Sequence, residues 1–248
     1  GQTVQLVGTD DALNSASCTF SVTAQDSTSP NAVCQNVTAF LDGSGSATIT
    51  TSDINNGSSD NCTATGQLGL SLSNSSFNCS NVGPNSVTLT VTDLAGNSSS
   101  CQATVTISDS IAPTAVCNNV TVVLDGNGEA TVLPNALGGG SSDNCGILSI
   151  ASSDSTFECA NIGSSPNPIL ITVTDSNANT STCIASVTVE DTLPPNPVCQ
   201  DITVYLDSTG NVTINGADVD GGSSDPCFIN SRTVSPNSFT CANVGLNT

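Results

Sequence analysis

The sequence has almost no basic residues. Its 248 residues include one Arg and no Lys or His, against 21 acidic residues, and the formal net charge is −20. Binding to nucleic acid or to an anionic membrane surface requires clustered Lys and Arg, so we expect neither class of partner. A hard cation such as calcium is an expected counter-charge, although a large negative charge also serves solubility alone.

The usual catalytic residues are scarce too. General bases and activated nucleophiles are mostly built from His, Lys or a reactive Cys, and the carboxylates that remain form no recognisable paired motif. We therefore predict that the chain is not an enzyme. There is also no Trp, and aromatic residues make up 3% of the chain, so each folding unit has few large side chains for its core.

One segment recurs three times, and the rest of the chain repeats in step with it. It runs from Cys18 to Cys34, from Cys101 to Cys117 and from Cys183 to Cys199. Its first half alternates apolar and polar residues, which is typical of a half-buried strand. A proline in its second half removes a ladder donor and ends the sheet. We interpret the segment as the last strand of one domain, a joint, and the first strand of the next.

The period of about 82 residues predicts a tandem array. We expect the C-terminal part of a repeat over residues 1–28, complete repeats over 29–110 and 111–192, and the N-terminal part of a repeat over 193–248, all cut from a longer protein. Short alternating runs, frequent turn signals and no helical periodicity predict all-β, immunoglobulin-like β-sandwich domains arranged as an extended rod. Residues 33–42 and 46–53 should form a hairpin, residues 63–72 a further strand, and Phe77, Phe157 and Phe239 should plug the cores.

Four cysteines per repeat indicate a disulfide framework and an oxidising, extracellular location. If the first and last strands of a repeat run in the same direction, Cys34 lies beside Cys101 and Cys117 beside Cys183. The remaining cysteines would then close shorter loops within each repeat: Cys62–Cys79, Cys145–Cys159 and Cys227–Cys241. Cys18 and Cys199 would pair outside the sequence.

The motifs resemble a known family. The run TLTVTDLAGNSSSCQATVTISD, with SSDNC before it and a D-x3-P-x3-C joint after it, resembles the hyalin (HYR) repeat, an immunoglobulin-like module. The LDGxG turn and the F-x-C-x-N-V-G segment are similar to the tandem repeats of giant Bacteroidota surface adhesins, including those of gliding motility. This resemblance implies a secreted or cell-surface protein that forms long adhesive fibres.

The joints hold the candidate metal ligands. Calcium takes six to eight oxygen ligands, and Asp residues recur at the joint and on the loop before the second cysteine of each repeat, although no EF-hand loop occurs. The candidates are Asp26, Asp60, Asp109, Asp143, Asp191 and Asp225. Turn residues such as Asp42, Asp125 and Asp207 are instead expected to bond local backbone.

Glycans are a second expected feature of the joints. Ser110 and Thr192 follow an Asp and precede an apolar residue, the pattern that Bacteroidota O-glycosylate, and Ser27 matches it loosely. Asn-x-Ser/Thr sequences are also frequent, as chance predicts in a chain rich in Ser and Thr.

These features favour a structural or adhesive extracellular filament, whose partners are neighbouring repeats and identical chains. Two alternatives remain at this point: an array of glycan- or ligand-binding modules, and the spacer region of a large secreted enzyme. A specific pocket needs aromatic or charged anchors, and the chain has one Tyr and one Arg, so the filament is the favoured interpretation.

Overall fold

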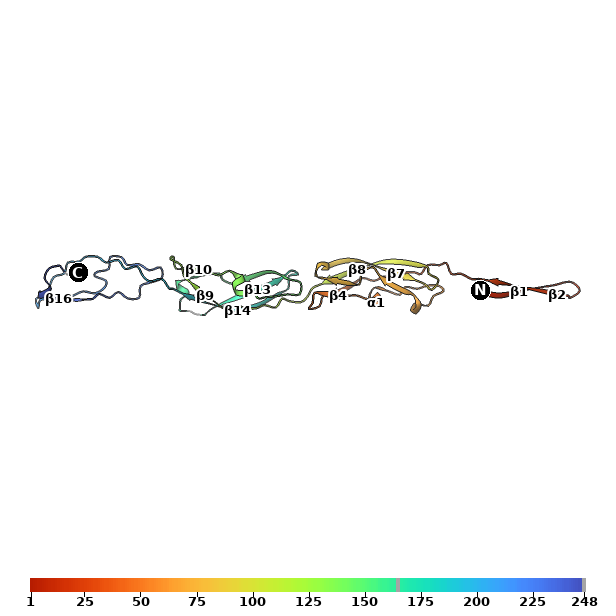
Figure 1. Cartoon of the computed structure of the whole chain (residues 1–248), viewed down its shortest axis with the longest axis horizontal. Helices are drawn as coiled ribbons and strands as arrows, with labels where there is room; N and C mark the ends of the chain where they lie inside the picture. Colours follow the sequence, from red (N-terminus) through yellow and green to blue (C-terminus); the bar gives the residue numbers. More distant parts are fainter. Residues whose placement is uncertain (164–165, 247–248) are drawn as a thin grey trace. The chain divides into compact units, whose positions relative to one another are not determined.

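A computed structural model describes residues 1–163 and 166–246 (Figure 1). The chain divides into two compact units, Gly1–Ile111 and Ala112–Thr248, and this boundary lies one residue from an expected repeat boundary. Both units are all-β apart from single-turn helices, and their sheets form disulfide-stapled, immunoglobulin-like sandwiches. None of the helices in the described residues is long and apolar enough to cross a membrane.

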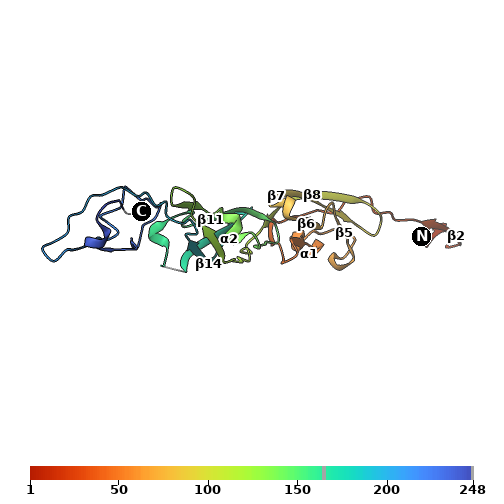
Figure 2. The same ribbon diagram turned by 60° about the vertical axis from the view of Figure 1, so that its left-hand side comes forward.

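The first unit is centred on a four-stranded sheet. Its strands lie in the order β3 (Val37–Phe40), β8 (Ser98–Ser108), β7 (Gly83–Thr92) and β5 (Gly69–Leu72). β3 runs parallel to β8, whereas the other pairs are antiparallel, and β7 and β8 lie side by side in Figures 1 and 2. Because alternate residues of a strand face the same side, Val87, Leu89 and Val91 of β7 all point inward and are fully buried.

A two-stranded layer closes the other side of this core. β4 (Ser46–Thr48) pairs with β6 (Ser76–Asn78), which places Ala47 directly opposite Phe77. Both side chains are buried, so Phe77 does plug the core as the sequence predicts.

The hairpin expected over residues 33–53 is wrong. Its two strands belong to different sheets, because the tight turn at Asp42, where Asp42 N donates to Ser46 O at 2.8 Å, passes the chain from one layer to the other. The second strand also ends early, and the single-turn helix α1 (Thr51–Ile54) follows it. Asp53 caps this helix by accepting from Thr50 N at 2.7 Å, and Ile54 is fully buried.

The second unit repeats this arrangement. Its larger sheet has the order β9 (Val120–Val123), β14 (Thr180–Glu190), β13 (Asn167–Asp175) and β11 (Ile147–Ser152), and β10 (Glu129–Thr131) pairs with β12 (Thr156–Glu158). The short helix α2 (Pro134–Gly138) packs against β11 (Figure 2). The core joins the two layers through Phe157 of β12, Ile171 of β13 and Val187 of β14.

The remaining elements are isolated or short. β1 (Gln2–Thr9) and β2 (Ser15–Val22) form a hairpin whose residues are all exposed, and residues 193–246 contain only the pair β15 (Asn211–Thr213) and β16 (Ser238–Thr240) among the described strands. The strand expected over residues 63–72 is shorter than predicted, because a 3-10 turn precedes β5. The 3-10 turns are η1 (Thr65–Gln67), η2 (Cys79–Asn81), η3 (Cys159–Asn161) and η4 (Cys241–Asn243).

Candidate functional site

Two disulfides staple the first strand of a repeat to its last strand. Cys34 is bonded to Cys101, and Cys117 to Cys183. These are the pairs expected from strand direction, and the parallel pairing of β3 with β8 is the reason: Val37 aligns with Val105, so the cysteines just before them meet. Each bond encloses almost an entire repeat.

The shorter pairs expected within one repeat are wrong. Cys159 is bonded to Cys227, 68 residues further along the chain, so neither Cys145–Cys159 nor Cys227–Cys241 forms. Cys62–Cys79 does not form either, because Cys62 is a free thiol. Cys79 and Cys145 are both disulfide-bonded. The free thiols are Cys18, Cys62, Cys199 and Cys241, all exposed.

The position of Cys159 explains the correction. Cys159 begins η3, and its Sγ lies over the β9–β10 turn, 3.8 Å from Gly128 O, and 3.5 Å from Pro226 O on the loop that carries Cys227. Cys159 therefore lies where its own repeat contacts the first part of the next repeat. The Cys159–Cys227 bond joins residues 111–192 to residues 193–246 covalently.

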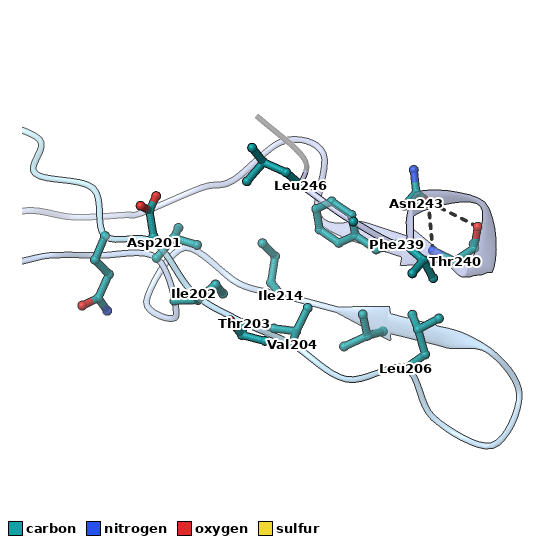
Figure 3. A pocket seen from close by; sticks show the side chains of 15 residues that line it. Asp201, Ile202, Thr203, Val204, Leu206, Ile214, Phe239, Thr240, Asn243 and Leu246 are labelled. Carbon is teal, nitrogen blue, oxygen red and sulfur yellow. Dashed lines mark hydrogen bonds between the residues drawn. The ribbon is translucent and has the colours of Figure 1, made fainter.

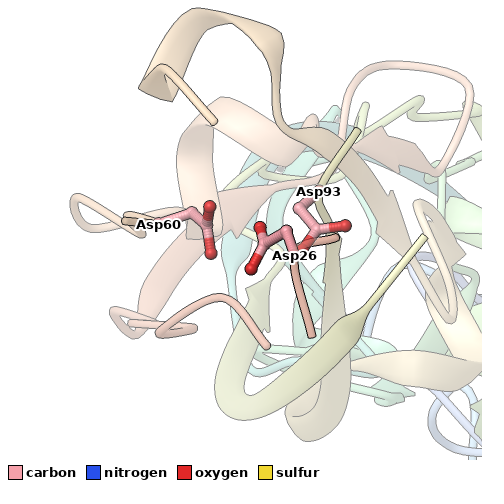
Figure 4. A group of neighbouring side chains, drawn as sticks. All are labelled: Asp26, Asp60 and Asp93. Atoms are coloured by element: carbon pink, nitrogen blue, oxygen red, sulfur yellow. The ribbon is translucent and has the colours of Figure 1, made fainter. Parts of the chain in front are cut away.

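Three acidic side chains gather at the start of the first complete repeat (Figure 4). Oxygen atoms of Asp26, Asp60 and Asp93 all lie within 4.8 Å of one another. Asp26 and Asp60 are ligands expected from the sequence, whereas Asp93, the residue that directly follows β7, was not expected. The signal that could have found it is a recurring Asp-x3-Asn sequence, at Asp93–Asn97 and again at Asp175–Asn179.

Local hydrogen bonds fix each of these carboxylates. Asp26 Oδ1 accepts from Thr28 N at 3.0 Å, and Asp60 Oδ2 accepts from Cys62 N and Thr63 N, both at 2.8 Å. Asp93 accepts from the Asn97 backbone at 2.7 Å and from Asn97 Nδ2 at 2.8 Å. The other oxygens of the first two acids, Asp26 Oδ2 and Asp60 Oδ1, are buried and have no hydrogen-bond partner.

The electrostatics of the cluster favour a bound cation. Burial by itself raises the pKa of Asp93, but the hydrogen bonds from Asn97, Gly96 and Ala95 outweigh it and hold this pKa below its ordinary value. Partial desolvation, and then the charges of Asp26 and Asp60, raise the pKa of the Cys62 thiol. Clustered carboxylates repel one another unless a proton or a cation lies among them. The oxygen-only ligand set suits calcium.

The other predicted ligands repeat parts of this geometry. In the second unit, Asp143 accepts from Cys145 N at 2.8 Å, and the fully buried Asp175 accepts from Asn179 N at 2.8 Å. Asp109 is buried and accepts from Ile111 N. Asp191 accepts from Leu193 N and Asp225 from Cys227 N, but neither belongs to a cluster of three acids within the described residues.

The predicted glycosylation residues are accessible. Ser27, Ser110 and Thr192 are all exposed, as a modified hydroxyl must be. Their modification remains a prediction.

No family model and no curated protein matches the sequence. Among solved structures, a protocadherin gamma-B7 fragment of domains EC3–6 is 15% identical, with 84% of this chain and 62% of that chain covered and a TM-score of 0.33. A PcdhgB3 fragment of domains EC1–4 is 13% identical, with coverages of 86% and 64% and a TM-score of 0.35. This chain therefore spans less than two-thirds of the length of either structure.

Proposed function

We propose that this chain is a load-bearing segment of an extracellular structural or adhesive filament, of the kind formed by the bacterial surface repeats that its motifs resemble. The disulfide between Cys159 and Cys227 carries this proposal, because it gives two consecutive repeats a second covalent connection besides the backbone. A module that only binds a ligand has no need of this connection. The disulfides also imply an oxidising compartment, which supports an extracellular location.

The disulfides Cys34–Cys101 and Cys117–Cys183, here called the staples, support the same role. Tension that enters near Cys34 passes directly to Cys101, so the 67-residue span between them is shielded from the load. The second repeat is shielded in the same way between Cys117 and Cys183, over a span of 66 residues. At roughly 3.5 Å per extended residue, each staple conceals about 230 Å of chain.

Single-molecule pulling tests the load-bearing function. The chain is held by its two ends and extended before and after treatment with a reductant. We expect no extension event of about 230 Å in the oxidised chain, because the disulfides carry the load, and one such event or a longer one per complete repeat after reduction.

A variant with Cys18, Cys62, Cys199 and Cys241 replaced by Ser is the matched control. This variant lacks every free thiol of the chain and should extend like the parent chain. That result would show that the native disulfides resist the force, and not additional disulfides formed by oxidation of the free thiols. Events of about 230 Å in the oxidised parent chain would contradict the proposed function.

We further propose that calcium binds between Asp26, Asp60 and Asp93 and stiffens the start of the repeat. The unpartnered oxygens Asp26 Oδ2 and Asp60 Oδ1 support this, since a cation would satisfy both.

Calcium titration tests this site. Calcium should raise the melting temperature of the chain, and a chelator should reverse the rise. The measurement should be calorimetric because the chain has no Trp. In Asp60→Asn the carbonyl oxygen can still accept from the Cys62 and Thr63 amides, but the charge is lost, so calcium affinity should fall about tenfold or more.

Asp11→Asn is the matched control for charge. Asp11 is exposed in the β1–β2 turn, outside the cluster, and its replacement should leave calcium affinity unchanged. If millimolar calcium and a chelator leave the melting temperature of the parent chain unaltered, the calcium site is disproved while the filament proposal stands.

A further inference from the structure

The three carboxylates of the Asp26–Asp60–Asp93 cluster come from three different segments of the chain (Figure 4). Asp26 lies between β2 and β3, Asp60 between α1 and η1, and Asp93 between β7 and β8. We call these segments the joint segment (residues 23–36), the loop (residues 55–64) and the turn (residues 93–97). Because like charges repel, contacts between the segments are needed to hold the carboxylates together.

Backbone hydrogen bonds connect the joint segment to the loop. Asn31 N donates to Ser59 O at 2.7 Å, and Ser59 N donates to Asn31 O at 3.1 Å. The buried Ser58 adds to this contact, since its Oγ accepts from Val33 N at 3.0 Å. The Asn31–Ser59 pair uses backbone atoms only, so it does not depend on the side chains at these positions.

The side chain of Thr63 connects the loop to the turn. Thr63 N donates to Asp60 Oδ2 at 2.8 Å, and Thr63 Oγ1 accepts from Leu94 N at 3.2 Å. Thr63 is 4% exposed, so water does not readily replace this second bond. Thr63 therefore contacts one ligand directly and fixes the residue that follows another, Asp93.

The second unit makes the same connection with different atoms. Gly146 stands at the position of Thr63, and Ser176 at that of Leu94. Gly146 has no hydroxyl, but its carbonyl oxygen accepts from Ser176 N at 3.1 Å and from Ser176 Oγ at 3.4 Å. The connection between loop and turn is thus kept where the residue that makes it differs, which favours a role for the connection itself.

The side chain of Asn97 connects the turn to the joint segment. Its Nδ2 donates to Asp93 Oδ2 at 2.8 Å and to the backbone carbonyl of Asp26 at 3.3 Å. The backbone of Asn97 holds the turn independently, because its N donates to Asp93 Oδ1 at 2.7 Å and its O accepts from Asp93 N at 3.0 Å. The side-chain amide therefore joins one ligand to the segment that carries another.

The cavity drawn in Figure 3 offers no comparable set of ligands. Its volume is about 590 Å³, and Asp201 is the one acid among its described lining residues. Ile202, Ile214 and Phe239 are among the apolar side chains that line it. Phe239, which the sequence predicts to plug a core, is only half-buried. Hard cations prefer oxygen ligands, so the three-acid cluster is the better cation site.

We propose that Thr63 and Asn97 are positioning residues of the calcium site, and that they close a frame which holds the three carboxylates together before the ion binds. This inference rests on the calcium site proposed above. Together with the Asn31–Ser59 pair, the two side chains connect the joint segment, the loop and the turn pairwise. A site assembled in advance costs less ordering when its ligand binds. Residues behind metal ligands commonly change metal affinity by about ten- to hundredfold.

Calcium titration of the isotope-labelled chain, followed by NMR, tests the frame. The backbone amides of Asp60 and Asp93 report on this site and are present in every variant. We expect their signals to shift and saturate in the parent chain. Thr63→Val lacks the hydroxyl and Asn97→Ala lacks the amide, but neither removes a carboxylate. Each should weaken calcium affinity about tenfold or more.

Matched variants control for the loss of a side chain. Thr63→Ser restores the hydroxyl and should restore the calcium affinity of the parent chain. Asn74→Ala should leave this affinity unchanged, because Asn74 is exposed, lies outside the three segments and accepts only from Ser76 N, at 3.3 Å.

Melting temperatures separate positioning from a purely structural role. A ligand stabilises the folded chain according to its affinity, so Thr63→Val and Asn97→Ala should show a smaller calcium-induced rise in melting temperature than the parent chain. Equal losses of stability with and without calcium would overturn the frame.

Variants that bind calcium as tightly as the parent chain would also overturn it. In both cases the calcium site itself stands, because the parent chain still gives saturable shifts. If the Asp60 and Asp93 amides of the parent chain do not respond to calcium, the calcium site is disproved, and the frame falls with it because it has no ligand to position.

Discussion

Gly128 shows how a single residue admits the bond between repeats. Its φ is 78°, and a Cβ at this position would lie 2.7 Å from Cys159 Sγ. The same pairing of turn and sulfur recurs at Gly210, where a Cβ would lie 2.7 Å from Cys241 Sγ. These glycines therefore serve the turn and also leave room for the sulfur above it.

Gly128→Ala should impair the Cys159–Cys227 bond. The new methyl group would force the sulfur away, in addition to the cost of about 1 kcal/mol or more for a left-handed residue with a side chain. Counting thiols by alkylation and mass spectrometry should give more free thiols than the four of the parent chain.

Gly163→Ala is the matched control for backbone strain. Its φ is 76°, but a Cβ there meets nothing within 4 Å, so the variant should keep four free thiols. Equal thiol counts in the two alanine variants would show that the space at Gly128 is not required for the bond.

At the scale of single elements, the alternating strands could be predicted because their pattern is local. Ala103, Val105 and Ile107 alternate in sequence and are all buried in β8. The short helix α1 was missed, since one turn has no periodicity and depends on a cap at Thr50 and on the buried Ile54. The change of sheet between β3 and β4 depends on contacts with β8 and β6, which are distant in sequence.

Among the cysteine pairs too, some could be predicted from the sequence and others could not. Strand direction within one repeat determines the Cys34–Cys101 pair, so the sequence was sufficient. The sequence was not sufficient to pair Cys159. Because the same cysteines recur in every repeat of a periodic array, their spacing does not show whether Cys159 bonds within its own repeat or to the next one. Only the fold shows that the start of η3 lies against the loop of Cys227.

At the scale of the whole molecule, covalent bonds replace a large core. A chain with 3% aromatic residues and a net charge of −20 has little apolar surface to bury and strong self-repulsion. Disulfides oppose both effects because they restrict the unfolded chain. Each disulfide stabilises the folded state by roughly 3–4 kcal/mol for loops of this length. The bond between repeats extends this restriction from one module to the next.

Cleavage at a joint tests this covalent continuity most directly. A recognition sequence for a site-specific protease is inserted between Thr192 and Leu193, in the exposed joint that precedes residues 193–248. After cleavage, we expect the two fragments to migrate as one species without reductant and to separate once reductant is added, because Cys159–Cys227 spans the cut. The same insertion in Cys227→Ser should separate without reductant. Fragments of the parent chain that separate at once, with no reductant present, would contradict the account.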